Sequence, residues 1–538
     1  MRYEFLGFSA LSIIVIGLLS YFVSPAWLWV FVVLGPFIVL GIYDMSQKKR
    51  SVVRNFPVFG RGRYLLEDLR PKLYQYFIES DTNGTPINRV DRSVAYQRAK
   101  TVVDTSPFGT QLDVYDEGYE WMNHSIGALD FNQLNHDPRV IVGGPDCQQP
   151  YDCSVFNVAA MSYGALSKTA VEALNGGAAI GNFAHNTGEG GISSYHDKPG
   201  GDLIYQVGTG YFGCRDEQGR FSPEKFKEIS QKPNVKMIEL KLSQGAKPGH
   251  GGILPAQKNT PEIAAIRGVE AGKSVDSPPF HTAFSTPLEL MEFIGEMRKL
   301  SGGKPVGFKI CIGHKAEFLA ICKAMVEKEI TPDFIAIDGA EGGTGAAPVE
   351  FSDSVGMPFR EGLAFAHDAL TGFNLRKKIK IFAAGKIITG FHMFRAMALG
   401  ADVCYSARGM MLALGCIQAL LCNKNTCPTG VTTQNPELVA GLVAENKKVR
   451  VANYHRETVK GFVELLGASG LREPKEIGRH HILRRVSMNK VSKYSDFFPY
   501  VHHGCLLKEE NIPEEWMDEW LAATSQSFQP QVVRVLTY

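Results

Sequence analysis

Two long uncharged stretches open the chain. Residues 5–23 carry no charge, and after a Ser24-Pro25 break residues 26–43 are again uncharged and rich in Val, Leu, Ile, Phe and Trp. A membrane-spanning helix needs about 20 apolar residues. The pattern predicts a two-helix transmembrane hairpin over residues 1–45, with Pro36 kinking the second helix, which membrane helices tolerate.

The segment after the hairpin is basic and contains Lys48, Lys49, Arg50, Arg54, Arg61 and Arg63. By the positive-inside rule, this side of the hairpin is cytoplasmic. We therefore expect the protein in the inner (cytoplasmic) membrane, with its body facing the cytoplasm. The alternative is a cleaved signal peptide, but no small-residue cleavage site follows Val23, and the second apolar run would remain unexplained.

The body of the chain alternates short apolar runs with helical stretches. From Val155 onward each run ends in Gly, Ser, Asn or Asp, which is the signature of repeated βα units. Eight strands are predicted, near residues 157–161, 179–184, 203–207, 237–241, 306–310, 334–337, 379–383 and 403–406. Eight such units favour an α/β fold with a closed (β/α)8 TIM barrel, which we place at residues 151–475. Residues 46–150 are expected to form a basic linker and an extension packing on the barrel, and residues 476–538 a C-terminal extension.

Polar, glycine-rich sequences follow the predicted strands. They are residues 162–167, 185–191, 244–252 and 338–346, and the shorter runs 384–386 and 407–409. In TIM barrels the chemistry lies on loops after the strands, and a phosphate commonly binds after strands seven and eight. One such loop is usually only a turn. Six such loops at the same end of consecutive strands predict a ligand site that would suit a phosphorylated cofactor such as FMN.

Composition excludes some partners. Lys and Arg total 57 against 55 Asp and Glu, which gives a net charge of +2, so we expect no nucleic-acid partner. The 10 cysteines lack the close, even spacing of a secreted disulfide scaffold and are expected to be reduced. Of these, Cys147 and Cys153 have no obvious partners and are expected to be structural.

Three cysteines stand close together. Cys416, Cys422 and Cys427 have the spacing C-x5-C-x4-C, with a proline directly after the last. Three thiolates at this spacing can hold an iron–sulfur cluster that lacks one corner iron. The alternatives are ordinary buried cysteines and zinc, which normally takes four ligands in a structural site.

The order of these motifs resembles one family. Residues 162–191, 244–255, 339–346 and 415–430 are similar to the FMN and iron–sulfur synthase domain of glutamate synthase, and the resemblance covers about residues 88–471. It implies FMN beside a 3Fe-4S cluster in a TIM barrel. It also implies reductive amination of 2-oxoglutarate, through 2-iminoglutarate, to glutamate, an oxidoreductase reaction of the EC 1.4 class. Electrons would come from ferredoxin or another protein donor and would leave the reduced flavin as a hydride.

The resemblance also implies roles for single residues. Lys247 is expected to pair with a substrate carboxylate, Glu189 to lie on the ammonia route, and Lys309 to place a positive charge near the flavin. From the residues alone, Lys309 could be a surface lysine and Glu189 a helix cap. FMN is expected to contact Ser162, Gly164, Gln244, Lys309, Gly343, Thr344, Gly385, Ala407 and Arg408, and the cluster to bind Cys416, Cys422 and Cys427.

The sequence departs from the resembled family in two loops. His250 stands where the family often has Glu, and Ala384-Gly385-Lys386 replaces the usual Asp-Gly-Gly. Two alternatives therefore stay open: an FMN and iron–sulfur barrel acting on a different small oxo or hydroxy acid, and a membrane-bound electron-transfer subunit.

The family's amidotransferase domain, with its N-terminal nucleophilic cysteine, has no counterpart in this sequence, and neither has its C-terminal β-helix. No NADPH fingerprint occurs either. We therefore expect a protein electron donor, and ammonia that is free or comes from a separate amidotransferase protein.

Overall fold

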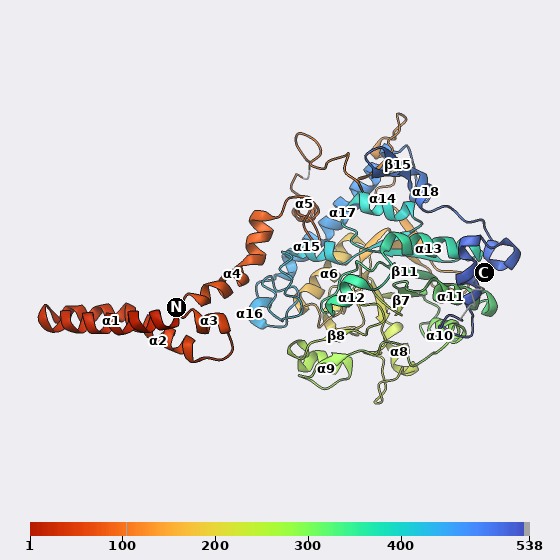
Figure 1. The fold of residues 1–538 in the computed structure, drawn as a ribbon. Helices are drawn as coiled ribbons and strands as arrows, with labels where there is room; N and C mark the ends of the chain where they lie inside the picture. The colour runs from red at the N-terminus through yellow and green to blue at the C-terminus, as the bar shows by residue number, and fades with distance from the viewer. Residues whose placement is uncertain (104, 532–538) are drawn as a thin grey trace, which may run out of the picture. The chain divides into compact units, whose positions relative to one another are not determined.

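The computed structural model describes residues 1–103 and 105–531 and divides the chain into two units, Met1–Arg89 and Val90–Tyr538 (Figure 1). The first unit begins with two apolar helices. Helix α1 (Arg2–Phe22) and the 3-10 helix η1 (Pro25–Val30), which continues into α2 (Phe31–Ser46), are long and apolar enough to cross a membrane. The two helices approach closely at Gly41, where any side chain would collide with the ring of Phe5. The unit continues with α3 (Ser51–Asn55), α4 (Gly60–Leu73) and a π-helical turn, η2 (Tyr74–Ile78).

The second unit contains a closed barrel of parallel strands, as predicted. The barrel runs in the order β10-β11-β12-β13-β4-β5-β6-β7. Strands β4 and β13 close the ring, with Phe156 opposite Cys404 and Val158 opposite Ser406. The strands are β4 (Phe156–Val158), β5 (His185–Asn186), β6 (Leu203–Val207), β7 (Val235–Lys241), β10 (Val306–Ile310), β11 (Phe334–Asp338), β12 (Lys380–Ala384) and β13 (Val403–Ser406).

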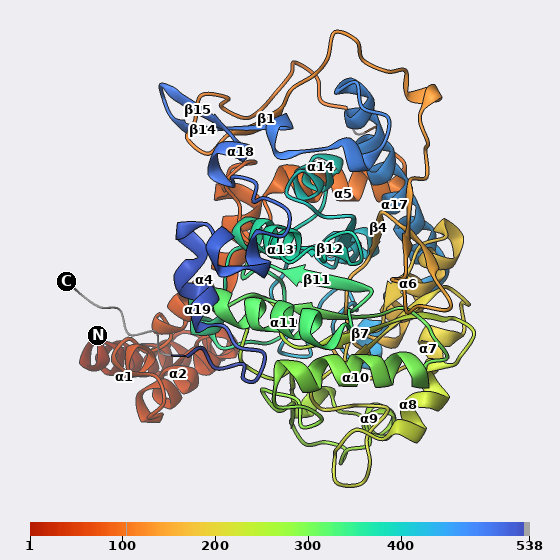
Figure 2. The same ribbon diagram turned by 90° about the vertical axis from the view of Figure 1, so that its right-hand side faces the viewer.

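Helices alternate with the strands and surround the barrel (Figure 2). They are α6 (Lys168–Gly181), α7 (Ser194–Asp197), α8 (Pro223–Ser230), α10 (Pro287–Leu300), α11 (Lys315–Lys328), α13 (Phe359–Gly372), α14 (Gly390–Ala398) and α15 (Arg408–Leu414). The long helix α17 (Ala444–Ala468) packs along α6. Local signals start several helices: Ser167 caps α6, and Thr286 and Glu289 form a capping box on α10.

The prediction of a strand over residues 179–184 is wrong. Helix α6 continues to Gly181, and Asn182 ends it in the left-handed conformation with φ 52°. The strand is the two-residue β5, which starts at His185. A short Ala-Ala-Ile run suits the last turn of a helix as well as a strand, and Ile180 is in fact exposed. Each of the other predicted strands overlaps an observed one.

The barrel interior changes from apolar to polar along the strands. Near the strand starts the inward side chains form an apolar layer that includes Ala184, Ile204, Met237, Phe334, Phe382 and Val403. Because side chains alternate with a period of two, residues 206, 239 and 241 point to the same side as residues 204 and 237. These three are Gln206, Glu239 and Lys241, so the polar layers lie toward the carboxyl ends of the strands.

Segments on either side of the barrel in sequence pair with each other. Strand β1 (Glu120–Met122) is antiparallel to β14 (Ile482–Ser487), which pairs with β15 (Lys490–Lys493). Other pairs are β2 (Arg139–Val142) with β3 (Tyr151–Ser154) and β8 (Ile253–Leu254) with β9 (Val275–Asp276). The remaining α-helices are α5 (Arg89–Lys100), α9 (Pro261–Arg267), α12 (Val349–Ser354), α16 (Pro436–Val439), α18 (Tyr494–Phe497) and α19 (Met517–Ala522). The predicted domain limits at 150 and 475 remain predictions.

Candidate active site

A buried ion pair lies at the carboxyl ends of the strands. Lys241, the last residue of β7, places its Nζ 2.8 Å from Oε1 of Glu189, on the loop after β5. Burial tends to raise the pKa of Glu189, but Lys241, Arg267 and Lys247 outweigh burial and lower it. The second carboxylate oxygen, Oε2, is buried and has no hydrogen-bond partner within residues 1–103 and 105–531. The site therefore contains an ionised carboxylate with one free acceptor.

Lys247 lies beside this pair on the loop after β7. The residue is only 4% exposed, and its Nζ donates a hydrogen bond to the carbonyl oxygen of Ala346, 2.8 Å away on the loop after β11. Burial and the neighbouring Lys241 lower the pKa of Lys247 to about 8, and Glu189 works in the opposite direction. At neutral pH Lys247 is therefore a buried cation that is neutralised by a modest rise in pH.

Lys309 forms a second ion pair inside the barrel. Its Nζ lies 3.0 Å from Oδ2 of Asp338, the last residue of β11, and the same oxygen accepts the Gly245 N–H at 3.0 Å. Burial opposes the charge on Lys309, but Asp338 and Glu239 outweigh it and raise the pKa. At 7% exposure Lys309 is not a surface lysine.

Glu239 occupies the polar layer below these pairs and was not predicted. Its Oε1 accepts hydrogen bonds from Asn186 Nδ2 (2.9 Å) and Gln206 Nε2 (2.6 Å), and its Oε2 accepts one from the Tyr405 hydroxyl at 3.1 Å. Burial raises the pKa of Glu239, against the opposing effects of Lys309 and these hydrogen bonds. Its signal in the sequence was a carboxylate inside the predicted strand, two residues before Lys241.

Glycines allow the loops at this end to touch. A side chain on Gly245 would overlap the carbonyl oxygen of Gly339, so the loops after β7 and β11 meet backbone to backbone. A Cβ on Gly188 would lie 2.5 Å from the Ser162 nitrogen, which joins the loops after β4 and β5 in the same way. Gly164 has φ 104°, which a side chain would strain.

The loops after β11, β12 and β13 bring two cations together. Arg408 donates from Nη2 to the carbonyl oxygen of Glu341 (2.7 Å), and a Cβ on Gly343 would lie 3.1 Å from its Nε. Burial and Arg408 lower the pKa of Lys386, which follows Gly385 and has φ 50°. Two cations beside loops that contain glycine, which leaves space, suit a phosphate group. Gly385 lies after β12, Thr344 is on the loop after β11, and Ala407 precedes α15.

The structure thus brings the predicted residues to one end of the barrel. Gln244 and Ser162 lie half-buried on the loops after β7 and β4, and Arg267 Nη2 lies 3.4 Å from the Ser162 hydroxyl. Sequence reasoning missed Lys241, Glu239 and Arg267. The roles of the predicted residues remain predictions.

The three clustered cysteines follow α15 on an irregular loop. The Tyr96 hydroxyl holds this loop by donating to the Cys416 carbonyl oxygen at 2.7 Å. Burial raises the pKa of Cys416 to about 11, and Cys422 and Cys427 add to the rise. For Cys427, hydrogen bonds with Thr429 and Thr432 outweigh burial and lower the pKa.

This cysteine loop is compatible with an iron–sulfur cluster through its donor chemistry. Clustered cysteine thiols are the usual cluster ligands, and the pKa of one of them, Cys427, is lowered. However, the described part of the chain contains no group of three or more His, Cys, Asp or Glu side chains arranged to hold a metal ion. The cysteines are free thiols.

A buried lysine lies beside the cysteine loop and was not predicted. Lys258 is 2% exposed, and its Nζ donates to the carbonyl oxygen of Ala165, on the loop after β4, at 3.1 Å. Burial lowers the pKa of Lys258 to about 8, opposed by Cys422 and Cys427. The preceding carbonyl, that of Gln257, accepts a hydrogen bond from Asn425 in the cysteine loop at 3.1 Å. Gln257 and Lys258 together thus connect the cysteine loop with the loop after β4.

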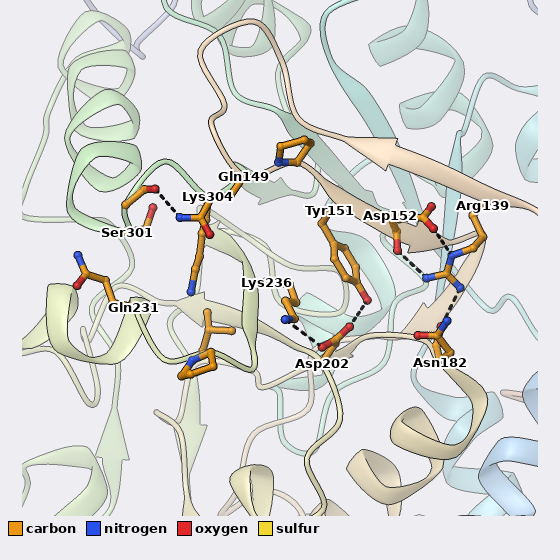
Figure 3. A pocket seen from close by; sticks show the side chains of 14 residues that line it. Arg139, Gln149, Tyr151, Asp152, Asn182, Asp202, Gln231, Lys236, Ser301 and Lys304 are labelled. Carbon is orange, nitrogen blue, oxygen red and sulfur yellow. Dashed lines mark hydrogen bonds and ion pairs between the residues drawn. The ribbon is translucent and has the colours of Figure 1, made fainter.

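A cavity of about 760 Å³ lies at the opposite end of the barrel (Figure 3). Its lining includes Val235 at the start of β7 and Asp202 just before β6. Asp202 interacts with Tyr151 and Lys236, so the polar groups there already pair with each other (Figure 3). In TIM barrels this end usually serves stability, whereas the chemistry lies on the loops after the strands.

Similarity to known proteins extends over most of the chain. Residues 111–472 match the conserved region in glutamate synthase. The chain is 38% identical over 482 residues to the glutamate synthase large subunit-like protein YerD of Bacillus subtilis, an alignment that covers 82% of this chain and 91% of YerD. It is 36% identical over 337 residues to the archaeal glutamate synthase (NADPH) of Methanocaldococcus jannaschii, covering 62% of each chain. Identity to the ferredoxin-dependent glutamate synthase of Cyanidium caldarium is 34% over 367 residues, covering 63% of this chain and 22% of that protein.

Proposed function

The chain belongs to the glutamate synthase family, and on this premise we propose that it aminates 2-oxoglutarate reductively to glutamate. The observation that carries the proposal is the set of buried charges on the loops after the strands. Lys247 and the pair of Lys241 with Glu189 converge there, at the end of the barrel where catalysis is expected. Ammonia would condense with the keto carbon with loss of water, and the imine would then take up a hydride and a proton.

Individual side chains suit the parts of this reaction. Lys247 would pair with a carboxylate of the dicarboxylic substrate, because a buried cation binds a carboxylate strongly. The free Oε2 of Glu189 would accept an N–H of the incoming ammonia. Lys241 would keep Glu189 ionised for that task, since their atoms are 2.8 Å apart.

The family implies FMN, and the residues at this end of the barrel fit it. Arg408 and Lys386 would neutralise the phosphate, with Gly343 and Gly385 leaving room for it. Lys309, Gln244 and Ser162 would lie along the isoalloxazine ring of FMN. When bound, FMN supplies the hydride.

The cysteines supply the donor set for the second cofactor. Cys416, Cys422 and Cys427 would hold a 3Fe-4S cluster, whose chemistry is one-electron transfer. The electron donor would be ferredoxin or a similar protein. We further propose that α1 and α2 anchor the chain in the inner membrane, with the barrel in the cytoplasm, because the basic run from Lys48 follows α2.

Turnover by the purified chain tests the proposed reaction. Anaerobic protein is supplied with reduced methyl viologen, 2-oxoglutarate and nitrogen-15 ammonium chloride, and labelled glutamate is measured by mass spectrometry. Parallel arms contain glutamine in place of ammonium, or other 2-oxo acids in place of 2-oxoglutarate. Labelled glutamate above the yield of the other amino acids supports the proposal. Protein that contains FMN and iron but forms no glutamate contradicts the proposal. Preference for another 2-oxo acid would mean a different substrate, and would direct attention to the loops that depart from the family, such as that of His250.

A further inference from the structure

Helix α4 and the turn η2 expose one continuous apolar face. Successive residues of a helix are about 100° apart, so side chains at positions 65, 66, 69, 73, 76 and 77 share about one third of its circumference. All six are large and exposed, from 37% for Leu69 to 81% for Phe77. We call this the α4 apolar face, comprising Leu65, Leu66, Leu69, Leu73, Tyr76 and Phe77. Six such side chains in one stripe form a patch that commonly marks an interaction surface.

Basic side chains border the α4 apolar face on both sides. On the same wheel Arg61 and Lys72 lie along one edge, and Arg63 and Arg70 along the other. The two acidic residues, Glu67 and Asp68, lie on the polar arc away from the apolar face. Arg70 and Lys72 form no ion pair with any residue that the structure describes, so their charges remain available.

The start of α4 is fixed beside the end of α2. Asp44, near the end of α2, is fully buried and receives hydrogen bonds from Arg61 Nε (3.0 Å), Arg61 Nη2 (2.6 Å) and the Val58 N–H (2.9 Å). A side chain on Gly60 would press on the backbone of Val53, so α3 and α4 pack without space between them. If α2 ends at the cytoplasmic membrane surface, α4 begins at that same surface.

We propose that α4 and η2 lie on the cytoplasmic surface of the membrane, with the α4 apolar face in the lipid. The partner is a bilayer containing anionic headgroups, because an apolar stripe with cations along both edges suits the boundary between acyl chains and headgroups. Long Arg and Lys side chains bury their stems and keep their charges at the headgroups. The basic run of residues 48–54 adds to the same attraction. This inference rests on the proposed membrane hairpin.

Photocrosslinking in the full-length protein tests the inference. A diazirine amino acid is placed at Leu66 or Phe77 on the apolar face. Glu67 on the polar arc is the matched control, and Leu18 in α1 reports on the hairpin. The protein is reconstituted in vesicles of phosphatidylcholine with a minor share of phosphatidylglycerol, illuminated and analysed by mass spectrometry. Lipid adducts at Leu18, Leu66 and Phe77, with several-fold fewer at Glu67, are expected.

The outcomes separate the two proposals. Lipid adducts at Leu18 together with only protein adducts at Leu66 and Phe77 would overturn this inference and leave the hairpin standing, because the face would then cover protein. No lipid adduct at Leu18 would overturn the hairpin and this inference with it. In a second measurement, Arg70→Gln with Lys72→Gln should lower the phosphatidylglycerol share of the Leu66 adducts several-fold, whereas Lys490→Gln on β15 should not. An unchanged share would exclude the anionic headgroups as partners.

Discussion

Lys247 is the buried cation that we propose binds a substrate carboxylate. Replacing it with Met should keep FMN bound and raise the KM for the oxo acid about 10- to 150-fold, because a charge-assisted hydrogen bond contributes about 1.5–3 kcal/mol. Its pKa of about 8 adds a pH signature. The side chain is charged below that pH, so kcat/KM should fall as the pH rises through about 8.

Steady-state kinetics across pH measures both effects. Lys247→Arg keeps a cation at high pH, so it should remove the alkaline fall even if its activity is lower. A Lys247→Met variant with wild-type KM would exclude Lys247 from substrate binding.

Lys258 is expected to set the reduction potential of the cluster. A cation near Cys422 and Cys427 favours the more negatively charged, reduced state. Lys258→Met should therefore make reduction at least tenfold less favourable, which is about 59 mV for one electron. A redox titration followed by electron paramagnetic resonance measures this potential, and Lys258→Arg is the control that retains the charge. Equal potentials in wild type and Lys258→Met would limit Lys258 to holding the loop after β4.

Single residues were predictable where they sit in a loop motif. Glu189 and Lys247 were singled out because their loops resemble the family's motifs, and Lys309 because it ends an apolar run. The partners of Glu239 could be identified only in the barrel, because Asn186, Gln206 and Tyr405 reach Glu239 from three other strands. Such pairing depends on strand register, which the sequence of one strand does not contain.

The contact between the loops after β7 and β11 requires that position 245 has no side chain. Gly245→Ala should push the Gly339 carbonyl away, at a cost of about 1–3 kcal/mol, and should lower flavin occupancy. Gly313→Ala, on the loop after β10, has open space and is the matched control. Flavin absorbance per protein and thermal unfolding measure the effect. Full flavin content in Gly245→Ala would show that the loops can separate without consequence.

The cysteine loop should carry the iron. Cys422→Ser is expected to remove the iron and its paramagnetic signal while FMN remains, because an alcohol is a poor substitute for a thiolate ligand. Cys147→Ser is the control, since the Cys147 thiol lies far from this loop in the sequence and donates to the Gly303 carbonyl oxygen. Unchanged iron content in Cys422→Ser would separate this loop from any cluster.

At the level of elements, periodicity predicted most of the barrel but not its exceptions. The longer barrel strands are mostly apolar and were easy to place, whereas β5 has only two residues and follows a helix that ends in Ala-Ala-Ile-Gly. The pairing of β1 with β14 joins Glu120 to Arg484. Contacts between residues so far apart in the sequence leave no local pattern in either segment.

The proposed orientation, with the barrel in the cytoplasm, rests on the proposed hairpin and the basic residues that follow it. Protease added to right-side-out vesicles should leave the barrel intact, and protease added to inverted vesicles should cleave it. Immunoblotting against the C-terminal part, with a periplasmic marker as control, distinguishes an intact barrel from a cleaved one. Cleavage in right-side-out vesicles would reverse the proposed orientation. Apolar length made the two helices predictable, but the apolar face of α4 was read in the sequence only as part of a basic linker.

The closing pair of the barrel also fixes an order of events during synthesis. Strand β4 keeps one unpaired edge until the ribosome has made β13, because Phe156 pairs with Cys404. The cysteine loop emerges later still, and α17, which packs on α6, comes after it. Cofactors that contact both halves could be taken up only after β13 and the cysteine loop have been made. If α1 and α2 form the proposed membrane hairpin, that hairpin is available to the membrane long before this point. On these proposals, the active site would be assembled only after the chain has been directed to the membrane.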